Sequence, residues 1–237
     1  MRSAVDLVVL DIAGTTIEEH GAVYVALEDA VVAAGGRPGR ADIGAWMGAD
    51  KHQAIAHLLT AADGPDSLPC QDAELVEEVY QNFRQLLSAA YADRPPAPIK
   101  GVPQALARLR AHGVAIALTT GFTREVTTPL LRSVGWDCGV VDTVVTVDDV
   151  PAGRPAPYLV FRAMERLGIH HVARVLVAGD TTRDLEAGTN AGAGFVVGVL
   201  TGGQDAQALG AARHTHLLPS AALLPELVLP TQPTDHR

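Results

Sequence analysis

The stretch Asp11-Ile12-Ala13-Gly14-Thr15-Thr16, with the apolar residues 5–10 before it, decides which fold this chain is expected to adopt. The apolar run is short and rich in β-branched residues, which predicts a buried strand of a parallel sheet. Asp11 then stands at the carboxyl end of that strand, where open α/β sheets place their chemistry. The sequence therefore predicts a reactive carboxylate at this edge of the sheet.

Strand and helix patterns alternate through the second part of the chain. Strands are predicted at 114–119, 140–145, 175–178, 195–199 and 216–218, and helices at 102–111, 123–134, 157–167 and 182–191. This alternation predicts an α/β fold with a doubly wound parallel sheet, a Rossmann-like core. Between the first strand and this region lie helical patterns at 22–34, 43–60 and 73–91, of which the second is either continuous or broken near Gly48. A stiff proline-rich connector follows at 95–98. We therefore expect a core formed by 1–17 and 98–237, with a small all-helical cap, 18–97, inserted after the first strand, and a frayed tail at 231–237.

Composition narrows the classes of function. The net charge of −9 argues against a nucleic-acid or anionic membrane surface. No long apolar stretch predicts a membrane span, and the first residues do not resemble a signal peptide. Cys70 and Cys138 have no metal-type spacing and fit a reduced cytoplasm. The expected protein is cytoplasmic, with a small-molecule substrate.

Two acidic residues follow the predicted strand 175–178. Asp180 and Asp184 are four positions apart, so a helix beginning near Thr181 would bring both carboxylates to one face. Clustered carboxylates at strand ends suit a hard cation, above all Mg²⁺. Asp180 alone is equally consistent with a helix cap, but together with Asp11 it favours a magnesium site.

Two further connections carry groups that suit an anion. Thr120 and Gly121 follow the strand 114–119 and offer a hydroxyl and a free amide before a helix. Arg154 lies in a Pro- and Gly-rich loop and is suited to neutralising a phosphoryl group. Each feature also has a structural alternative. Thr120 and Gly121 are consistent with an ordinary turn and a helix cap, and Arg154 is consistent with a solvated loop arginine.

These four connections, in this order, resemble the four motifs of the haloacid dehalogenase (HAD) superfamily, over residues 5–200. Within it, Asp11–Thr16, residues 119–125 and residues 144–157 resemble the phosphonoacetaldehyde hydrolase (phosphonatase) family. The resemblance implies that Asp11 is the nucleophile, that Thr120, Gly121 and Arg154 bind the phosphoryl group, and that Mg²⁺ is held by Asp11, the Ala13 carbonyl, Asp180 and Asp184. Most phosphatases of the superfamily carry a second Asp, a general acid, where this chain has Ala13.

The same family uses a lysine of the cap, and residues 47–51 are similar to the segment that carries it. The resemblance places Lys51 in register with that lysine and Met47 at the substrate. Only Lys51 and Lys100 are lysines among the 18 basic residues, so a retained lysine suggests amine chemistry. Asp50 is expected to oppose this by stabilising the charged amine, unless a helix turns the two side chains apart.

The expected function is Mg²⁺-dependent cleavage of the carbon–phosphorus bond of a 2-oxo-alkylphosphonate through a Lys51 imine and an aspartyl phosphate. Phosphonoacetaldehyde and phosphonopyruvate both fit the motifs. A second anionic group would require a further cation, for which Arg37, Arg40 and Arg84 are candidates. The alternatives are a HAD phosphomonoesterase with a replacement acid and a non-catalytic HAD-derived binding protein.

Two features of the cap complete these expectations. His20 and His52 lie near the predicted site elements and are considered as proton carriers, although a surface position is the commoner case. The helix 73–91 has a broad apolar face around Val79, Phe83 and Leu86. Because relatives of this type often pair through their caps, we expect a homodimer through this surface.

Overall fold

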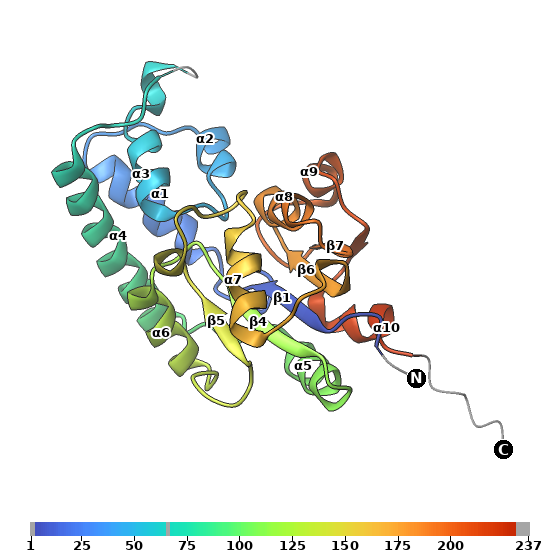
Figure 1. The fold of residues 1–237 in the computed structure, drawn as a ribbon. Helices are drawn as coiled ribbons and strands as arrows, with labels where there is room; N and C mark the ends of the chain where they lie inside the picture. Colours follow the sequence, from blue (N-terminus) through green and yellow to red (C-terminus); the bar gives the residue numbers. More distant parts are fainter. Residues whose placement is uncertain (1–2, 65–66, 231–237) are drawn as a thin grey trace.

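A six-stranded parallel sheet forms the centre of the protein in a computed structural model that describes residues 3–64 and 67–230 (Figure 1). Its strand order is β5-β4-β1-β6-β7-β8. The strands are β1 (Leu7–Asp11), β4 (Ala115–Thr119), β5 (Thr143–Val145), β6 (Val175–Gly179), β7 (Phe195–Val199) and β8 (His216–Leu218). The chain order reverses at β1, which makes its carboxyl end the switch point of the sheet.

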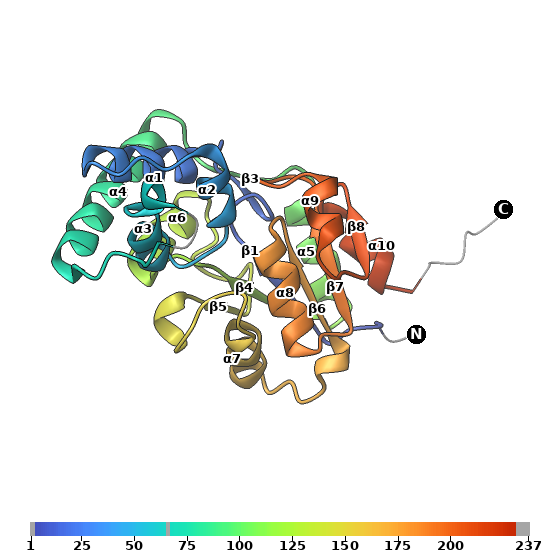
Figure 2. The same ribbon diagram turned by 90° about the horizontal axis from the view of Figure 1, so that it is seen from above.

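Helices cover both faces of this sheet (Figure 2). On one side lies α5 (Val102–Ala111), backed by α10 (Leu224–Val228), and on the other lie α7 (Tyr158–Leu167) and α8 (Thr182–Ala191). Successive residues of β1 enter two different apolar clusters: Val8 packs with the α5 side and Val9 with the α7 side. Burial on both faces explains why residues 5–10 form a continuous apolar run. The doubly wound α/β core is therefore confirmed.

The inserted segment forms four helices that pack together beside the core (Figure 1). They are α1 (Ala22–Ala33), α2 (Arg40–Ala45), α3 (Lys51–Leu58) and α4 (Ala73–Asp93), with α4 packed against α1 and α3. The two connections to the core pair with each other as a short antiparallel ribbon of β2 (Ile17–Glu18) and β3 (Ala97–Pro98). The ribbon stands at the predicted cap boundaries, and part of the expected stiff connector is therefore a strand.

Several elements differ from expectation. The helical pattern at 43–60 is two helices with a break near Gly48, one of the two predicted possibilities, and the first of them begins earlier, at Arg40. The break forms because Gly48 adopts a left-handed conformation with φ 74° and Asp50 caps a new helix. The short helices α9 (Ala206–Ala211) and α10 and the ribbon strands were not predicted, since elements of two to six residues carry too little periodicity. Helix α6 (Arg124–Ser133) is close to its predicted bounds. The predicted tail at 231–237 lies outside the described residues.

The apolar face of α4 is inside the protomer. Val79 and Phe83 are buried against the other cap helices, and Leu86 is half-buried. The surface that motivated the expected homodimer is thus used within the cap, because a helix hydrophobic along one stripe buries that stripe against its nearest neighbours. The homodimer remains a prediction, and this face of α4 no longer supports it.

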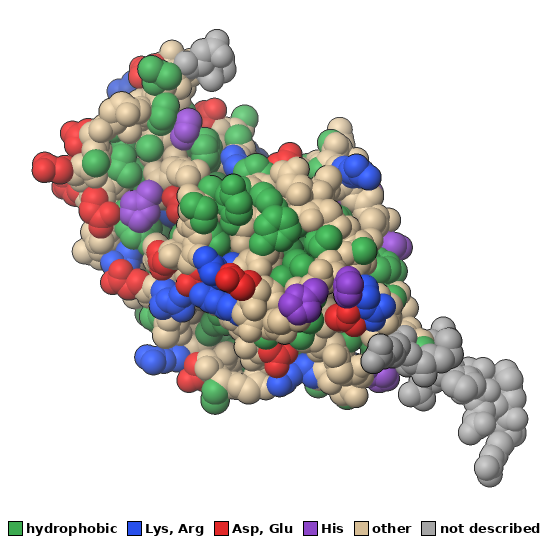
Figure 3. All heavy atoms as spheres, viewed as in Figure 1, with side chains coloured by type: hydrophobic (Ala, Val, Ile, Leu, Met, Phe, Trp, Pro, Cys, Tyr) green, Lys and Arg blue, Asp and Glu red, His purple; other side chains and the backbone are tan. Residues whose placement is uncertain are grey.

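The outer surface carries charges of both signs. Figure 3 shows acidic side chains gathered over α4, where Glu74, Glu77 and Glu78 are exposed. Three arginines of α6 and α7 are paired with acidic side chains: Arg124 and Arg166 with Asp149, at 2.6 and 2.7 Å, and Arg162 with Glu165. No helix in the described part of the chain is long and apolar enough to cross a membrane.

Phe83 lies in the core of the cap, so we expect its truncation to lower the free energy of unfolding strongly. This side chain is fully buried, and Phe→Ala changes in cores cost about 3–5 kcal/mol. We expect Phe83→Ala to lower the free energy of unfolding by that amount in urea denaturation. Leu68→Ala, at a position that is 80% exposed, is the control and is expected to have little effect. A cost below about 1 kcal/mol for Phe83→Ala would contradict this packing.

Candidate active site

Three strand ends, the loop after β5 and one cap segment meet at a small cavity. Asp11 pairs in register with Thr119, and Leu10 with Ala178, so the residues that follow β4 and β6 lie beside Asp11. The cavity has a volume of about 20 Å³, enough for roughly one water. Its lining includes the predicted residues Asp11, Ala13, Lys51, Thr120, Gly121, Arg154 and Asp180. The structure thus brings together residues from five segments that are far apart in sequence.

The motif after β1 is tied to the loop after β6. The Thr15 hydroxyl donates to Asp180 Oδ1 at 2.9 Å, and the Thr16 hydroxyl donates to the Asp11 carbonyl at 3.0 Å. Gly14 has φ 83°, and a Cβ there would lie 2.6 Å from Asp180 Oδ2. Glycine is therefore required at this position by both conformation and space.

Arg154 holds the centre of the site. Its side chain is buried, and Nη1 contacts Asp11 Oδ1 at 2.7 Å and also donates to Asp184 Oδ1. Burial opposes the charge of the guanidinium, but Asp184 and Asp11 outweigh it and raise the pKa of Arg154. Its buried Nε has no partner in the described part of the protein, which leaves a donor available for an anion.

The carboxylates suit a cation in part. Burial raises the pKa values of both Asp11 and Asp180, with Asp184 adding repulsion. A bound cation would relieve this cost, and the oxygen donors of Asp11, Asp180 and the Ala13 carbonyl suit Mg²⁺. Within 3–64 and 67–230, no three His, Cys, Asp or Glu side chains are arranged as a complete metal cluster.

Asp184 has partners other than those expected. Its Oδ1 accepts from Arg154, and its Oδ2 accepts from the Thr181 amide at 3.1 Å and from the Thr181 hydroxyl. Both oxygens are therefore committed to fixing Arg154 and the start of α8. Its expected role as a metal ligand stays a prediction, and the geometry found here makes it a positioning residue for Arg154.

Lys51 is the first residue of α3 and points into the protein. It is only 4% exposed, and its Nζ donates to the Ala49 carbonyl at 3.0 Å and lies 5.4 Å from the centre of the Phe122 ring. Burial, and then the nearby Arg154 charge, lowers the pKa of Lys51 to about 8. A place in the first turn of a helix acts in the same direction.

The expected conflict with Asp50 is small in this arrangement. The Asp50 carboxylate accepts from the Gln53 amide at 2.9 Å and caps α3. Its charge raises the pKa of Lys51 less than burial and Arg154 lower it. The acidic neighbour is therefore used to begin the helix that presents the lysine.

The cap is closed onto the core along two glycine contacts. A Cβ on Gly48 would lie 2.6 Å from the Thr181 hydroxyl oxygen, and one on Gly121 would lie 2.5 Å from the Ala49 carbonyl oxygen. The Gly121 amide makes no hydrogen bond to another described residue, so it remains available to an anion. Because the cavity holds little more than one water, a substrate of several heavy atoms does not fit while the cap has this position.

Other candidates lie elsewhere. Met47 does not line the cavity; its sulfur packs near Gly203, 2.9 Å from where a Cβ would stand. The imidazole of His52 contacts Glu77 at 3.1 Å on the cap surface, and His20 lies beside Glu18. Neither histidine is among the residues that line the cavity.

The three arginines considered for a second anionic group are also remote. Arg37 and Arg40 are exposed, and Arg84 pairs with Glu125. None of them lines the site cavity. These side chains lie on the surface of the cap, and their positions in the sequence do not indicate that they point away from the site cavity.

Three functional neighbours were missed by sequence reasoning. Tyr24 and Phe122 line the cavity, and buried Glu19 accepts from the Val23 amide at 2.8 Å to begin α1. Phe122 belongs to a recognised motif but has no reactive group, and Tyr24 lies just beside the apolar stripe of α1. The sequence carries no strong signal for either aromatic residue.

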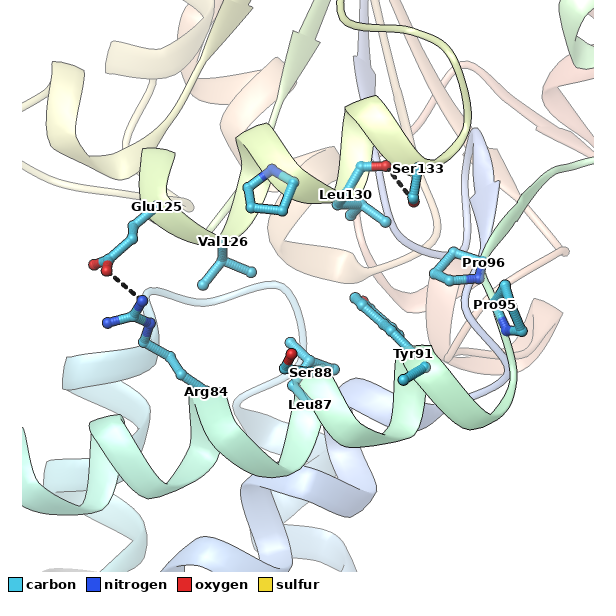
Figure 4. A pocket seen from close by; sticks show the side chains of 12 residues that line it. Arg84, Leu87, Ser88, Tyr91, Pro95, Pro96, Glu125, Val126, Leu130 and Ser133 are labelled. Carbon is cyan, nitrogen blue, oxygen red and sulfur yellow. Dashed lines mark hydrogen bonds and ion pairs between the residues drawn. The ribbon is translucent and has the colours of Figure 1, made fainter.

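A larger cavity lies away from this chemistry, between α4 and α6. It has a volume of about 320 Å³, and Figure 4 shows Leu87 and Tyr91 of α4 facing Val126 and Leu130 of α6. The Arg84–Glu125 pair closes one end. None of the predicted catalytic residues lines it, so volume alone does not identify the active site.

The chain belongs to the haloacid dehalogenase-like hydrolase family, whose model matches residues 5–192. Phosphonoacetaldehyde hydrolase of Bacillus cereus is 36% identical over 130 residues, which are 55% of this chain and 48% of that protein. The match therefore spans about half the length of this curated relative.

Solved structures share the fold. A phosphonoacetaldehyde hydrolase-like protein from Oleispira antarctica superposes with a TM-score of 0.78 at 22% identity, covering 96% of this chain and 93% of that one. A predicted phosphoglycolate phosphatase from Haemophilus somnus superposes with a TM-score of 0.71 at 16% identity, covering 94% and 98%. At these identities the structures establish the fold alone, which supports more than one reaction.

Proposed function

We propose that this protein hydrolyses the carbon–phosphorus bond of a 2-oxo-alkylphosphonate, with phosphonoacetaldehyde as the preferred substrate. The observation that carries the proposal is a buried lysine of lowered pKa in the same cavity as Asp11, where position 13 offers only a methyl group. The similarity to phosphonoacetaldehyde hydrolase of Bacillus cereus supports the same reaction.

Ala13 and Lys51 belong to one chemical argument. Cleaving a phosphate ester releases an alkoxide, which a carboxylic acid at position 13 would protonate. Cleaving a carbon–phosphorus bond releases a carbanion, which requires an electron sink instead. A neutral amine supplies that sink by condensing with the substrate carbonyl.

The steps balance as follows. The neutral Lys51 amine adds to the carbonyl carbon, water leaves and one proton is taken up from solvent, which forms a cationic imine. An Asp11 carboxylate oxygen attacks phosphorus, the carbon–phosphorus pair moves into the imine, and an enamine and an aspartyl phosphate result. Protonation and hydrolysis of the enamine release acetaldehyde and free Lys51. A second water hydrolyses the aspartyl phosphate, so the net reaction consumes one water.

The site contains hydrogen-bond donors that are available to bind a phosphoryl group. The Arg154 Nε and the Gly121 amide have no acceptor among the described residues, and the Thr120 hydroxyl lines the same cavity. Such donors stabilise the charge on the equatorial oxygens during transfer. Arg154 would exchange part of its contact with Asp11 for the phosphoryl oxygens.

Mg²⁺ fits the oxygen donors of this site. Asp11, Asp180 and the Ala13 carbonyl would hold it, with Asp184 acting through Arg154. The ion would neutralise phosphoryl charge and keep the two buried carboxylates ionised. Asp180 is already oriented by Thr15 and by the Gly203 amide at 2.8 Å.

The charges favour an aldehyde over phosphonopyruvate. Of the residues that line the site cavity, only Lys51 and Arg154 are cations, and both are used in the proposed reaction. A substrate carboxylate would therefore remain unpaired beside Asp11 and Asp180, which is costly in a buried site.

The test is to measure phosphate and acetaldehyde release from phosphonoacetaldehyde with Mg²⁺ and with EDTA. We expect equal molar release of both products, loss with EDTA, and a much lower kcat/KM for phosphonopyruvate. Faster Mg²⁺-dependent release from a panel of phosphate monoesters would establish a phosphomonoesterase instead. Folded protein that releases phosphate from no compound would favour the non-catalytic alternative.

A further inference from the structure

A second cavity adjoins the catalytic one. It has a volume of about 120 Å³, room for several waters, and is walled by residues of the β2 region and by Thr201, Gly202 and Gly203. The two cavities share Ala13, Tyr24 and Asp180. These three residues therefore form the partition between the catalytic cavity and the adjoining space.

Of the three partition residues, Tyr24 has the large side chain whose substitution would widen the connection between the two cavities. Ala13 contributes a methyl group, and Asp180 is fixed by Thr15 and Gly203. The Tyr24 ring comes from α1 of the cap and lies against Gly203, where a Cβ would stand 3.5 Å from ring carbon Cε2. The phenol hydroxyl makes no hydrogen bond to any described residue, so the ring acts here by its bulk.

The adjoining cavity has a distinct chemistry. Glu18, Glu19 and Asp180 line it, and no Lys or Arg among the described residues does. A group that enters it must therefore be uncharged or cationic, because an anion would be repelled without a partner. Its walls are tight at Gly202, where a Cβ would lie 2.0 Å from Asp180 Oδ2.

We propose that Tyr24 determines substrate length by closing the adjoining cavity to the catalytic one. The inference rests on the proposed function and extends it: the native chain takes a 2-oxo-alkylphosphonate with hydrogen on its carbonyl carbon. Removal of the ring lets uncharged alkyl groups enter the adjoining space, and carboxylates remain excluded. Tyr24 is thus a specificity-determining residue that takes no part in bond cleavage.

The experiment compares kcat/KM for phosphonoacetaldehyde and 2-oxopropylphosphonate in the native chain, Tyr24→Phe, Tyr24→Leu and Tyr24→Ala. A single carbon in a pocket is worth about 10–200-fold in specificity. We expect the preference for the aldehyde to fall at least about tenfold in Tyr24→Ala and by less in Tyr24→Leu. Tyr24→Phe keeps the ring and is expected to keep the preference. Val25→Ala, on the exposed side of α1, is the control.

A binding assay separates this inference from the proposed reaction. Ethylphosphonate and butylphosphonate lack the carbonyl, so neither forms an imine nor is cleaved, and calorimetry with Mg²⁺ measures their affinities. Tyr24→Ala and Tyr24→Leu are expected to gain affinity for butylphosphonate relative to ethylphosphonate. If that gain appears while no variant cleaves an oxo-phosphonate, the proposed function fails and the size role of Tyr24 stands. An unchanged ratio in the folded variants, or binding of neither compound, overturns the inference.

Discussion

Lys51→Arg is expected to abolish release of phosphate from phosphonoacetaldehyde, with a fall in kcat of about 10⁴-fold or more. The substitution keeps a positive charge at the start of α3, but a guanidinium does not condense with a carbonyl. If Lys51 acted only as a buried cation, activity would survive this change. If its amine forms an imine, activity would be lost. Phosphate release under saturating substrate measures the loss.

Borohydride provides the direct control for this prediction. Reduction during turnover is expected to fix a two-carbon adduct on Lys51 in the native chain, found by mass spectrometry of peptides. Lys100→Arg changes the other lysine, which is exposed, and is expected to leave both turnover and trapping intact. Turnover by Lys51→Arg within tenfold of the native rate would exclude the imine.

The same lysine gives the pH dependence its direction. With a pKa of about 8, the neutral amine increases as pH rises through 8, so kcat/KM is expected to rise and level off above it. The unfolded chain keeps its lysine at the ordinary value of 10.5 and so binds more protons between pH 8 and 10.5. The buried lysine therefore costs stability below pH 8, and the cost fades as pH rises toward 10.5.

A neutral side chain at this position is expected to stabilise the fold. The shift from 10.5 to about 8 corresponds to on the order of 3 kcal/mol. Lys51→Met should raise the free energy of unfolding at pH 7 by up to that amount, less the lost contact with the Ala49 carbonyl. Urea denaturation at pH 7 and pH 10 measures it, and the gain should shrink at the higher pH. A lower free energy of unfolding for Lys51→Met at pH 7 would contradict the conclusion that burial of the Lys51 amine costs stability.

Asp11→Asn is the second change with a very large expected effect. The amide has the size of the carboxylate but is a poor nucleophile toward phosphorus, so phosphate release should fall about 10⁴-fold or more. Acid quenching of the native chain during turnover is expected to leave phosphate on Asp11, and the variant should carry none. The imine on Lys51 should still form in Asp11→Asn and be trapped by borohydride, because condensation precedes the attack.

The control for Asp11→Asn is Asp29→Asn, on the exposed side of α1. It is expected to retain the native rate and the native phosphoenzyme. Substantial phosphate release by folded Asp11→Asn would assign the nucleophile to another group and would remove the aspartyl phosphate from the mechanism.

The sheet and its catalytic edge could be predicted because buried parallel strands are continuous apolar runs. The run at 5–10 and the strand Phe195–Val199 were recognised in this way, and Asp11, Thr120 and Asp180 followed from their places at strand ends. Lys51 was recognised because residues 47–51 resemble the lysine-bearing segment of the phosphonatase family and because lysine is rare in this chain. Such signals are local, and a single sequence contains them.

The remaining features depend on contacts between distant residues. Ile17 pairs with Pro98, and the Arg154 guanidinium joins Asp11 to Asp184. Met47 lies near Gly203 of the loop after β7, and Tyr24 of α1 reaches a cavity formed mostly by the core. Neither spacing nor periodicity encodes these placements.

The ribbon between cap and core has a mechanical consequence. Ile17, in its first strand, also accepts from the Gly14 amide at 2.8 Å, and it bridges to Ala13 itself. The strand that carries the cap is thus fastened directly to the loop whose carbonyl is proposed to hold the metal. A rotation of the cap about the ribbon would therefore also displace that carbonyl, so opening of the site and the arrangement of the metal ligands would be coupled through Ile17.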